Sequence, residues 1–457
     1  MSGSDFLHLD PDAAPSRGRT TWLAAEIRTA IVDGTLGAGV QLPSTRDLAE
    51  ELAFSRGVVV EAYRRLTEEG VLLTNRGAGT RVADALPVVA RSRRATRPVP
   101  SEPLRISEGA PDLSAFPRAA WLQAERRILA TATAHDLGYA DPQGVPALRA
   151  ELSGWLARSR GVTVDPERII VTAGVTGALS LIAQTLRGRG ITTAAIEDPS
   201  ADGNRRILGY WLDDLLPVPV DAQGLDVVAL GASGARVVLT TPAHQFPTGV
   251  VLSPTRRREL VAWAEDADGF IIEDDYDSEY RYDRAPVRAL HASAPERILH
   301  VSSLSKVLAP ALRIGWMIAP ESWHEDLVRR RWATDLGSPA LPQLALADLI
   351  RTGVLERQVR RLRLRHRARR DAAVAALREH LPGCRVEGIA AGLHLVVVLP
   401  EHVDDVALAA RAAAVGILVR PLSAYRIGAG TPGLVIGYGP HPSPRLATAI
   451  ATLGRLL

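Results

Sequence analysis

From about residue 105 onward, short apolar runs alternate with helical or turn segments, and this alternation constrains the fold more than any other feature. Helices between apolar strands are typical of an α/β domain whose mostly parallel sheet is covered on both faces. The sequence therefore predicts a doubly wound α/β domain over residues 105–342. The six runs expected to be strands are 168–171, 193–196, 236–239, 269–272, 297–301 and 313–318.

Residues 343–457 follow a different pattern. A long arginine-rich helix, a strand pair around 385–398 and two further helices predict a smaller α+β domain. The basic run at 357–365 is compatible with a DNA contact. However, Val359 and Leu362 recur at helical spacing within it, which favours the solvated face of a helix.

Residues 15–83 predict a winged helix-turn-helix domain. Apolar residues recur at helical spacing over 20–33, Ser44 is placed to cap a second helix, and a third helix is expected over 56–69. Two short strands flank a glycine turn at 76–79 and predict a β-hairpin, the wing.

The third predicted helix is amphipathic. Arg56 is the first residue of this helix and lies outside the expected buried stripe, on another face. Recognition helices read bases with their N-terminal residues. Arg56 is therefore the candidate base-reading residue, and double-stranded operator DNA is the expected partner. The alternative is a small structural domain with an ordinary solvated face. The buried stripe comprises Val59, Ala62, Tyr63 and Leu66. The candidate DNA-binding residues, phosphate contacts included, are Ser44, Arg46, Arg56, Arg64 and Arg76.

Between the two regions, residues 84–104 hold four prolines and four arginines without an apolar period. Proline-containing segments of this kind are semi-extended, so the segment is interpreted as a linker.

Composition narrows the setting. The formal charge of +3 is too small to indicate nucleic-acid binding by itself. The sequence contains no stretch of about 18 apolar residues, so no membrane-spanning helix is expected. The start of the chain has neither a basic nor an apolar leader region. The single cysteine, Cys384, cannot form an intramolecular disulfide and fits a reducing cytoplasm. Without an HExxH spacing or a cysteine pair, no metal site is expected.

One count points to chemistry. Of the 54 basic residues, 53 are arginine and one is a lysine, Lys306. Arginine replaces lysine freely on a solvated surface, but it cannot serve where a primary amine must lose its proton, as in Schiff-base formation. The alternative is a chance survivor of a general bias against lysine, so the neighbouring residues must decide.

Groups suited to a phosphate lie close to Lys306. Ser303, Ser305 and Arg313 supply two hydroxyls and a fixed cation. The segment 172–177, which contains Val175 and Thr176, ends a strand and opens a helix, so its backbone N–H groups form an anion site.

A phosphate beside a Schiff-base lysine suggests pyridoxal 5'-phosphate (PLP). PLP also needs an acid at its pyridine nitrogen, and the strand ending at 271–277 supplies acids there.

The chain resembles the MocR/GabR-type regulators, in which a GntR-like winged helix-turn-helix is fused to a class I, fold-type-I aminotransferase-like domain. The resemblance covers nearly everything from about residue 20 to the end, and it rests on several motifs together. They are Gly109-Ala110-Pro111-Asp112, the segment 139–144 (YADPQG), the segment 244–249 (HQFPTG), the segment 273–280 (EDDYDSEY), Ser303-Leu304-Ser305-Lys306, and Leu312-Arg313-Ile314-Gly315.

This resemblance implies roles for individual residues. Lys306 is the expected catalytic residue and forms the Schiff base with PLP, Asp274 pairs with the pyridine nitrogen, and Tyr276 reaches the ring hydroxyl. Tyr139 is expected to reach the phosphate of the neighbouring subunit, which makes the protein a homodimer. The residues implied to hold the phosphate are Thr176, Ser303, Ser305 and Arg313.

Three departures separate the chain from ordinary class I transaminases. Phe246 stands where they carry asparagine, Ala201 stands where an aromatic residue stacks on the cofactor ring, and the late strand at 434–438 lacks the usual carboxylate-binding arginine. Arg420 and Arg426 are the candidate substitutes.

The expected function is a cytoplasmic, DNA-binding transcriptional regulator that senses PLP or an adduct of PLP with an amine or amino acid. The alternative is a working class I aminotransferase with an appended DNA-binding domain. The candidate effector-binding residues are Gly109, Arg420 and Arg426.

Overall fold

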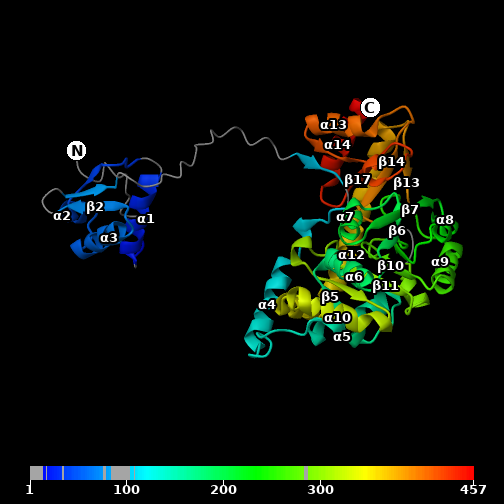
Figure 1. The fold of residues 1–457 in the computed structure, drawn as a ribbon. Coiled ribbons are helices and arrows are strands. Elements are labelled where there is room, and N and C mark those ends of the chain that lie inside the picture. Colours follow the sequence, from blue (N-terminus) through cyan, green and yellow to red (C-terminus); the bar gives the residue numbers. More distant parts are fainter. Residues whose placement is uncertain are drawn as a thin grey trace. The chain divides into compact units, whose positions relative to one another are not determined.

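The chain forms two compact units, which are described separately. They span Met1–Pro100 and Ser101–Leu457, and Figure 1 colours the first one blue. The predicted linker at 84–104 lies almost wholly outside the described residues, and the domain boundaries stay predictions. No helix of the described residues is long and apolar enough to span a membrane. The computed structural model describes residues 14–16, 18–32, 35–75, 79–83, 103–107, 109–282 and 287–457.

The first unit combines three helices with a three-stranded antiparallel sheet. The three helices and the hairpin that the sequence predicts are confirmed. The first strand was not predicted, because two residues carry no readable alternation. The helices are α1 (Arg19–Val32), α2 (Thr45–Glu51) and α3 (Arg56–Glu68). In sheet order, the strands are β1 (Gln41–Leu42), β3 (Gly79–Val82) and β2 (Leu72–Asn75).

Local contacts fix the helix-turn-helix. Ser44 Oγ accepts a hydrogen bond from the Asp47 backbone N–H at 3.2 Å, which confirms the predicted cap of α2. The buried residues of α3 are the four that the sequence predicts. One of them, Tyr63, donates its hydroxyl to the Pro43 carbonyl at 3.0 Å and so ties α3 to the start of α2.

The second unit is built on an eight-stranded sheet, and all six predicted runs are strands of it. β12 and β8 run antiparallel to their neighbours, and the other strands are parallel to one another. In sheet order the strands are β5 (Ile169–Thr172), β12 (Gly315–Ile318), β11 (Ile298–Ser303), β10 (Phe270–Asp274), β9 (Val237–Thr240), β6 (Thr193–Asp198), β7 (Asp214–Asp221) and β8 (Gly224–Leu225).

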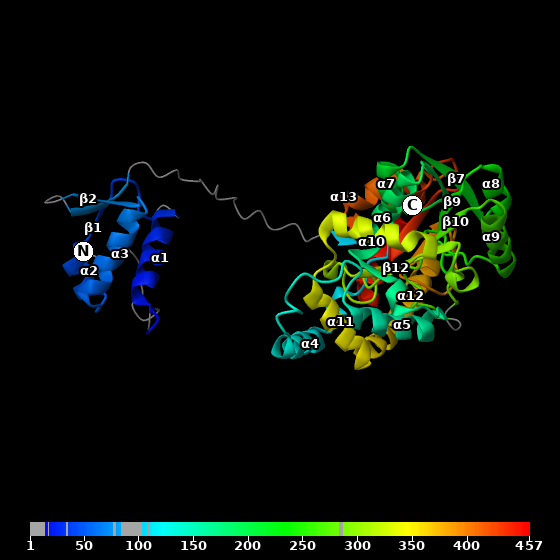
Figure 2. The same cartoon turned by 60° about the horizontal axis from the view of Figure 1, so that its bottom comes forward.

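Helices cover both faces of this sheet, as the doubly wound prediction requires (Figures 1 and 2). Alternate residues of one strand enter different cores: Ile170 packs in the core with α6, whereas Val171 packs in the core with α5. One face is covered by α6 (Gly174–Gly188), α7 (Asp202–Trp211) and α10 (Glu321–Asp335). The other face is covered by α5 (Pro146–Arg160), α8 (Val227–Ala232), α9 (Pro254–Asp266) and α11 (Ala340–Arg351), and α4 (Arg118–Thr131) packs against α11.

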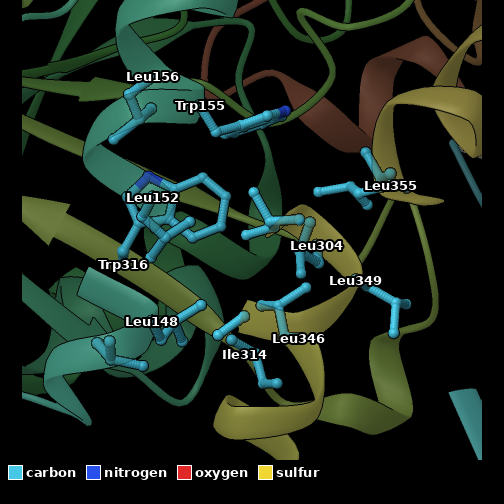
Figure 3. Close-up of a cluster of buried hydrophobic side chains, with 14 of the residues drawn as sticks. Leu148, Leu152, Trp155, Leu156, Leu304, Ile314, Trp316, Leu346, Leu349 and Leu355 are labelled. Atoms are coloured by element: carbon cyan, nitrogen blue, oxygen red, sulfur yellow. The ribbon is translucent and has the colours of Figure 1, made fainter. Parts of the chain in front are cut away.

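One of these cores positions the site directly (Figure 3). Trp155 of α5 meets Trp316 of β12 edge to face at 5.6 Å, and both side chains are buried. Leu304 and Ile314 belong to the same core. Since Leu304 precedes Lys306 by two residues and Ile314 follows Arg313, packing here fixes both segments that carry the predicted cofactor contacts.

The C-terminal part confirms the predicted helix, strand pair and two further helices. Its antiparallel sheet contains, in order, β13 (Arg385–Glu387), β14 (His394–Val398), β17 (Gly433–Gly437) and β16 (Arg420–Pro421). Its helices are α12 (Val354–His380), α13 (Asp405–Ala414) and α14 (Ser443–Leu456).

The basic run lies on α12. Val359 and Leu362 are buried, while Arg357, Arg360 and Arg361 are exposed. This burial pattern agrees with the prediction that the run forms the solvated face of a helix. Arg363 departs from it, because this side chain donates to the Glu279 carbonyl at 2.8 Å.

The chain enters the second unit on its C-terminal part. The short strand β4 (Leu104–Arg105) pairs in parallel with β15 (Ile417–Leu418). The next residue, Ile106, is fully buried in the core formed by α12, α13, α14 and the C-terminal sheet.

Candidate functional site

A cleft lies at the carboxyl ends of β10 and β11 and at the start of α6, where ligands bind in open α/β sheets. The structure brings nine of the predicted site residues to its lining. They are Gly109, Val175, Thr176, Asp274, Tyr276, Ser303, Ser305, Lys306 and Arg313.

Asp274 ends β10 with its carboxyl buried. Asn204, in the first turn of α7, donates to Asp274 Oδ2 at 2.8 Å, and Asp274 Oδ1 has no hydrogen-bond partner among the described residues. Burial raises the pKa of Asp274 to about 7, and the charges of Asp275 and Asp277 add to this effect. The carboxyl is therefore ready to accept a cationic donor from the cleft.

Lys306 lies in the turn that follows β11. Buried Leu304 and Val307 anchor the turn, and Tyr280 donates its hydroxyl to the Lys306 carbonyl at 2.9 Å. The lysine charge favours the ionised form of Asp274 and so opposes the rise in that pKa. Lys306 and Asp274 thus share one cleft and interact electrostatically.

The predicted phosphate groups gather at the first turn of α6. Val175 and Thr176 lie in the first turn of the helix. Ser303 ends β11 and Ser305 lies in the turn that follows, where Ser303 Oγ accepts from the Ser305 N–H at 3.3 Å. Arg313 has φ +51° and donates to the Ala173 carbonyl, which holds its guanidinium at the helix N-terminus. Backbone N–H groups, hydroxyls and a guanidinium together suit a phosphate dianion.

A glycine makes this corner possible. A Cβ at Gly315 would lie only 2.7 Å from the Cα of Gly174, the first residue of α6. The motif Leu312-Arg313-Ile314-Gly315 thus joins the arginine that is predicted to bind phosphate to the close approach of β12 and α6.

Tyr276 lines the cleft next to His244. Its hydroxyl lies 3.0 Å from His244 Nδ1, and the same nitrogen lies 2.9 Å from Asp277 Oδ2. Burial raises the pKa of Tyr276 well above its usual range, and the charges of Asp277 and Asp274 reinforce this effect. The phenol therefore stays protonated and keeps a hydrogen to donate.

Three predicted site residues do not line the cleft of their own chain. Tyr139 is 91% exposed. Arg420 donates to Asp202 Oδ2 at 3.1 Å and lies 5.0 Å over the Tyr425 ring, so it touches two residues of the lining. Arg426 follows Tyr425 in sequence and lies outside the lining.

Several lining residues were not predicted as site residues. Asn204 was missed although it lies in the first turn after a parallel strand, a position that ligands of α/β sheets commonly use. Tyr425 comes from the 3₁₀ helix Leu422–Tyr425, and its sequence carries no signal. Phe246 and Ala201, noted from the sequence as departures, line the cleft with them.

The structure also gathers three buried side chains from distant segments. One ligand atom from each of His244, Asp277 and His394 lies within 4.8 Å of the others. Sequence spacing did not suggest this group, because 33 residues separate His244 from Asp277. The distance of 2.9 Å between His244 Nδ1 and Asp277 Oδ2 is that of a hydrogen bond. The expectation that the protein has no metal site stays a prediction.

In the first unit, Arg56 begins α3 on the exposed face and makes no hydrogen bond or ion pair with the residues that the structure describes. Arg46 pairs with Glu50 at 3.1 Å. Arg64 pairs with Glu61 at 2.6 Å and also with Glu68. Arg76, in the predicted wing, lies outside the described residues.

Comparison with known proteins agrees with this architecture. A family model described as aminotransferase class I and II matches residues 102–443, and one described as bacterial regulatory proteins, gntR family, matches residues 20–82. An archaeal alanine:glyoxylate aminotransferase of known structure superposes with a TM-score of 0.71 at 27% identity, covering 78% of this chain and 90% of that one. The class is therefore a GntR-type helix-turn-helix domain joined to a fold-type-I aminotransferase-like domain.

Two regulators are similar over nearly their whole length. The pyridoxine biosynthesis regulator PdxR of Corynebacterium glutamicum is 37% identical over 95% of this chain and 94% of its own. The probable rhizopine catabolism regulator MocR of Rhizobium meliloti is 32% identical, over 92% and 89%. The chain belongs to this family of helix-turn-helix transcriptional regulators, and DNA is its partner.

The cofactor of this aminotransferase class is PLP, and the residues present fit it. The unpartnered Asp274 Oδ1 suits a protonated ring nitrogen, and the corner at α6 suits the phosphate. Lys306 supplies an amine in the same cleft. When bound, PLP withdraws electrons from the substrate amine carbon.

Proposed function

We propose that this protein controls transcription by binding operator DNA through residues 15–83 and sensing PLP, or a PLP adduct of an amine or amino acid, in the cleft of the second unit. The observation that carries the proposal is the unpartnered, buried Asp274 Oδ1 in a cleft that also holds Lys306 and the groups for a phosphate. A cytoplasmic location follows from action on DNA.

The proposed roles follow the chemistry of each group. Lys306 holds the cofactor covalently, Asp274 accepts from its ring nitrogen, and Tyr276 donates to its ring oxygen. Arg420, which contacts two residues of the lining, is the proposed partner for the carboxylate of an amino-acid effector. Gly109, in the lining, and Arg426, which follows Tyr425 in sequence, complete the proposed effector-binding set. The proposed phosphate contacts are Val175, Thr176, Ser303, Ser305 and Arg313.

The class of effector is suggested by one relative. The Corynebacterium protein is named as a regulator of pyridoxine biosynthesis, which favours a B6 vitamer as the ligand sensed here. Arg420 is already engaged by Asp202, and β17 carries no arginine for a substrate carboxylate. Both observations favour PLP itself over an amino acid as the primary signal.

We further propose a homodimer in which Tyr139 of each subunit reaches the phosphate site of the other. In support, Tyr139 is exposed together with large apolar side chains of the same region, among them Leu129 at 59% and Leu137 at 61%. Contiguous exposed apolar surface marks interaction sites, and these side chains come from one stretch of the chain.

A working aminotransferase is the second candidate function. The combination of Lys306, Asp274 and Arg313 in one cleft favours it. Ala201 in the lining and the arginine-free β17 count against turnover of ordinary amino acids. Multiple-turnover assays with common amino donors separate the two candidates, because a sensor binds PLP without sustained transfer.

The deciding experiment titrates labelled DNA from upstream of the protein's own gene, at fixed salt, with and without PLP. A regulator must bind DNA with different affinity in its two ligand states, typically by about 1–3 kcal/mol. We expect this dependence in the wild type and its loss in Lys306→Ala, with the intrinsic DNA affinity retained. Equal DNA affinity with and without bound PLP would contradict sensing.

A further inference from the structure

The hydroxyl of Tyr276 is backed by a buried histidine–aspartate pair. His244, in the loop after β9, is 4% exposed, and Asp277, three residues beyond β10, is 2% exposed. The His244 ring lies nearly parallel to the Tyr276 ring, at 26° and 6.1 Å. His244 therefore stands between a carboxylate and a tyrosine that faces the cleft.

Space for this pair depends on Gly392, at φ +72°. A Cβ there would lie 2.2 Å from His244 Cε1 and 2.5 Å from Asp277 Oδ2. Any other residue at this position would displace one member of the pair, so the close contact of histidine and carboxylate is built into the local backbone.

Hydrogen-bond chemistry assigns the proton between His244 and Asp277. A carboxylate only accepts, so the Nδ1 atom that lies 2.9 Å from Asp277 Oδ2 carries the hydrogen. Tyr276 Oη, 3.0 Å from the same Nδ1, then has no lone pair there to receive its proton. The oxygen of Tyr276 can accept a share of the histidine hydrogen. The Asp277 carboxylate is the other acceptor near the Tyr276 O–H, and because both of its oxygens lie within 3.2 Å of His244 Nδ1, the histidine hydrogen competes for it and favours an O–H that points to the cleft.

The neighbouring groups preserve this arrangement. His394 lies 5.3 Å from His244, ring to ring, and its Nε2 lies 3.0 Å from the Pro247 carbonyl. Burial lowers the pKa of His394 to about 4, so it stays neutral and adds no competing charge beside Asp277.

We infer that Asp277 and His244 are positioning residues that direct the Tyr276 O–H into the cleft, toward the ring oxygen of PLP. The inference rests on the proposed binding of PLP. His244, a residue of the 244–249 motif, would thus orient the Tyr276 hydroxyl without itself contacting the cofactor.

The test is a double-mutant cycle on PLP affinity, measured by visible absorbance of the full-length protein. Tyr276→Phe removes the hydrogen bond and should weaken binding roughly fivefold. Asp277→Asn removes the charge that holds the hydrogen on Nδ1, which permits the other histidine tautomer and lets Tyr276 donate to Nδ1 instead of to the cleft. We expect a similar loss for Asp277→Asn and no further loss when the two changes are combined.

His244 supplies an independent arm and a conservative rescue. His244→Leu should reproduce the loss seen in Tyr276→Phe, whereas His244→Asn, whose amide can replace the Nδ1–H donor, should retain most of the affinity. Tyr282→Phe is the matched control, because this tyrosine donates to the Gly392 carbonyl at 2.7 Å and does not line the cleft. It should bind PLP as the wild type does.

The outcomes separate the two levels of the argument. Wild-type protein that fails to bind PLP contradicts the proposed function itself. Wild-type binding with additive losses in the cycle, or with full affinity in His244→Leu, overturns only the positioning role. If Asp277→Asn does not fold, the comparison of His244→Leu with His244→Asn, each with and without Tyr276→Phe, decides the question alone.

Discussion

Asn204 donates a hydrogen bond to one oxygen of Asp274, at 2.8 Å, and leaves the other oxygen without a partner among the described residues. The amide comes from the first turn of α7 and the carboxyl from the end of β10, so two separate elements fix the carboxyl. A ring nitrogen that enters the cleft therefore meets a buried acceptor whose orientation is already set.

This arrangement predicts a pH effect on the apoprotein. The pKa of Asp274 is about 7, against 3.8 for the free group, because burial disfavours the charge. The folded state therefore binds the proton more tightly, and the free energy of unfolding falls as pH rises from about 4 to 7. Asp274→Asn should remove this loss, on the order of 1–4 kcal/mol, and raise the melting temperature at pH 8 but not near pH 4. Thermal melts of both apoproteins check this.

Glu279 is the matched control for that variant. Burial also raises its pKa to about 7, and it does not line the cleft. Glu279→Gln should flatten the pH dependence of stability and keep PLP affinity. Asp274→Asn should weaken PLP binding about 10- to 100-fold, since a charge-assisted hydrogen bond is lost. Equal PLP affinity in the two variants would contradict the role of Asp274.

Lys306 is predicted to be the site of covalent attachment. Borohydride reduction of the PLP-loaded protein, followed by peptide mass spectrometry, should place the cofactor on Lys306. Lys306→Arg keeps a cation but lacks an amine that can lose its proton, so it should fold and show no attachment. A label on the N-terminal amine, or a wild type that stays colourless with PLP, would contradict the prediction.

Arg56 is predicted to matter more for operator binding than Arg64. Arg56 has no partner among the described residues, whereas Arg64 is held by Glu61 and Glu68. Arg56→Ala should cost about 1–3 kcal/mol in operator affinity and leave PLP binding unchanged. Arg64→Ala should cost less. Fluorescence anisotropy at fixed salt measures both, and the reverse ranking would argue against Arg56 as the base-reading residue.

The shared site predicts complementation between two defective subunits. Tyr139→Phe should weaken PLP binding by about 1 kcal/mol, through loss of a hydrogen bond to phosphate. In a mixed dimer with Lys306→Ala, one of the two sites combines an intact Lys306 with an intact Tyr139. That site should regain wild-type affinity in equilibrium titration. A monomer with normal PLP affinity would exclude the arrangement.

Much of the fold was predictable because its signals are local. The six apolar runs, the hairpin of the first unit and the buried stripe of α3 depend on residues close in sequence. β7 escaped prediction because Pro217 and Pro219 interrupt its apolar pattern. Prolines are tolerated there because β7 lies near the sheet edge: it pairs with β6 on one side, but on its other side only the two-residue β8 pairs with it, beyond both prolines.

The candidate site was predictable where motifs carry chemistry. Lys306, Asp274 and Arg313 stand in recognisable segments and line one cleft. Asn204 and Tyr425 were not predicted, because their positions depend on how α7 and the C-terminal part pack against the strand ends. Sequence distance conceals such contacts, since 70 residues separate Asn204 from Asp274.

The pairing of β4 with β15 has a consequence for how a signal leaves the cleft. β15 is followed at once by β16, which carries Arg420, and by the short helix that ends at Tyr425 on the cleft wall. Leu104 and Arg105, at the start of the second unit, are thus paired with the same segment of chain that reaches the cleft wall. We therefore predict that a ligand in contact with Tyr425 acts on the segment 417–425 and on its partner strand β4 directly, without first rearranging the large sheet.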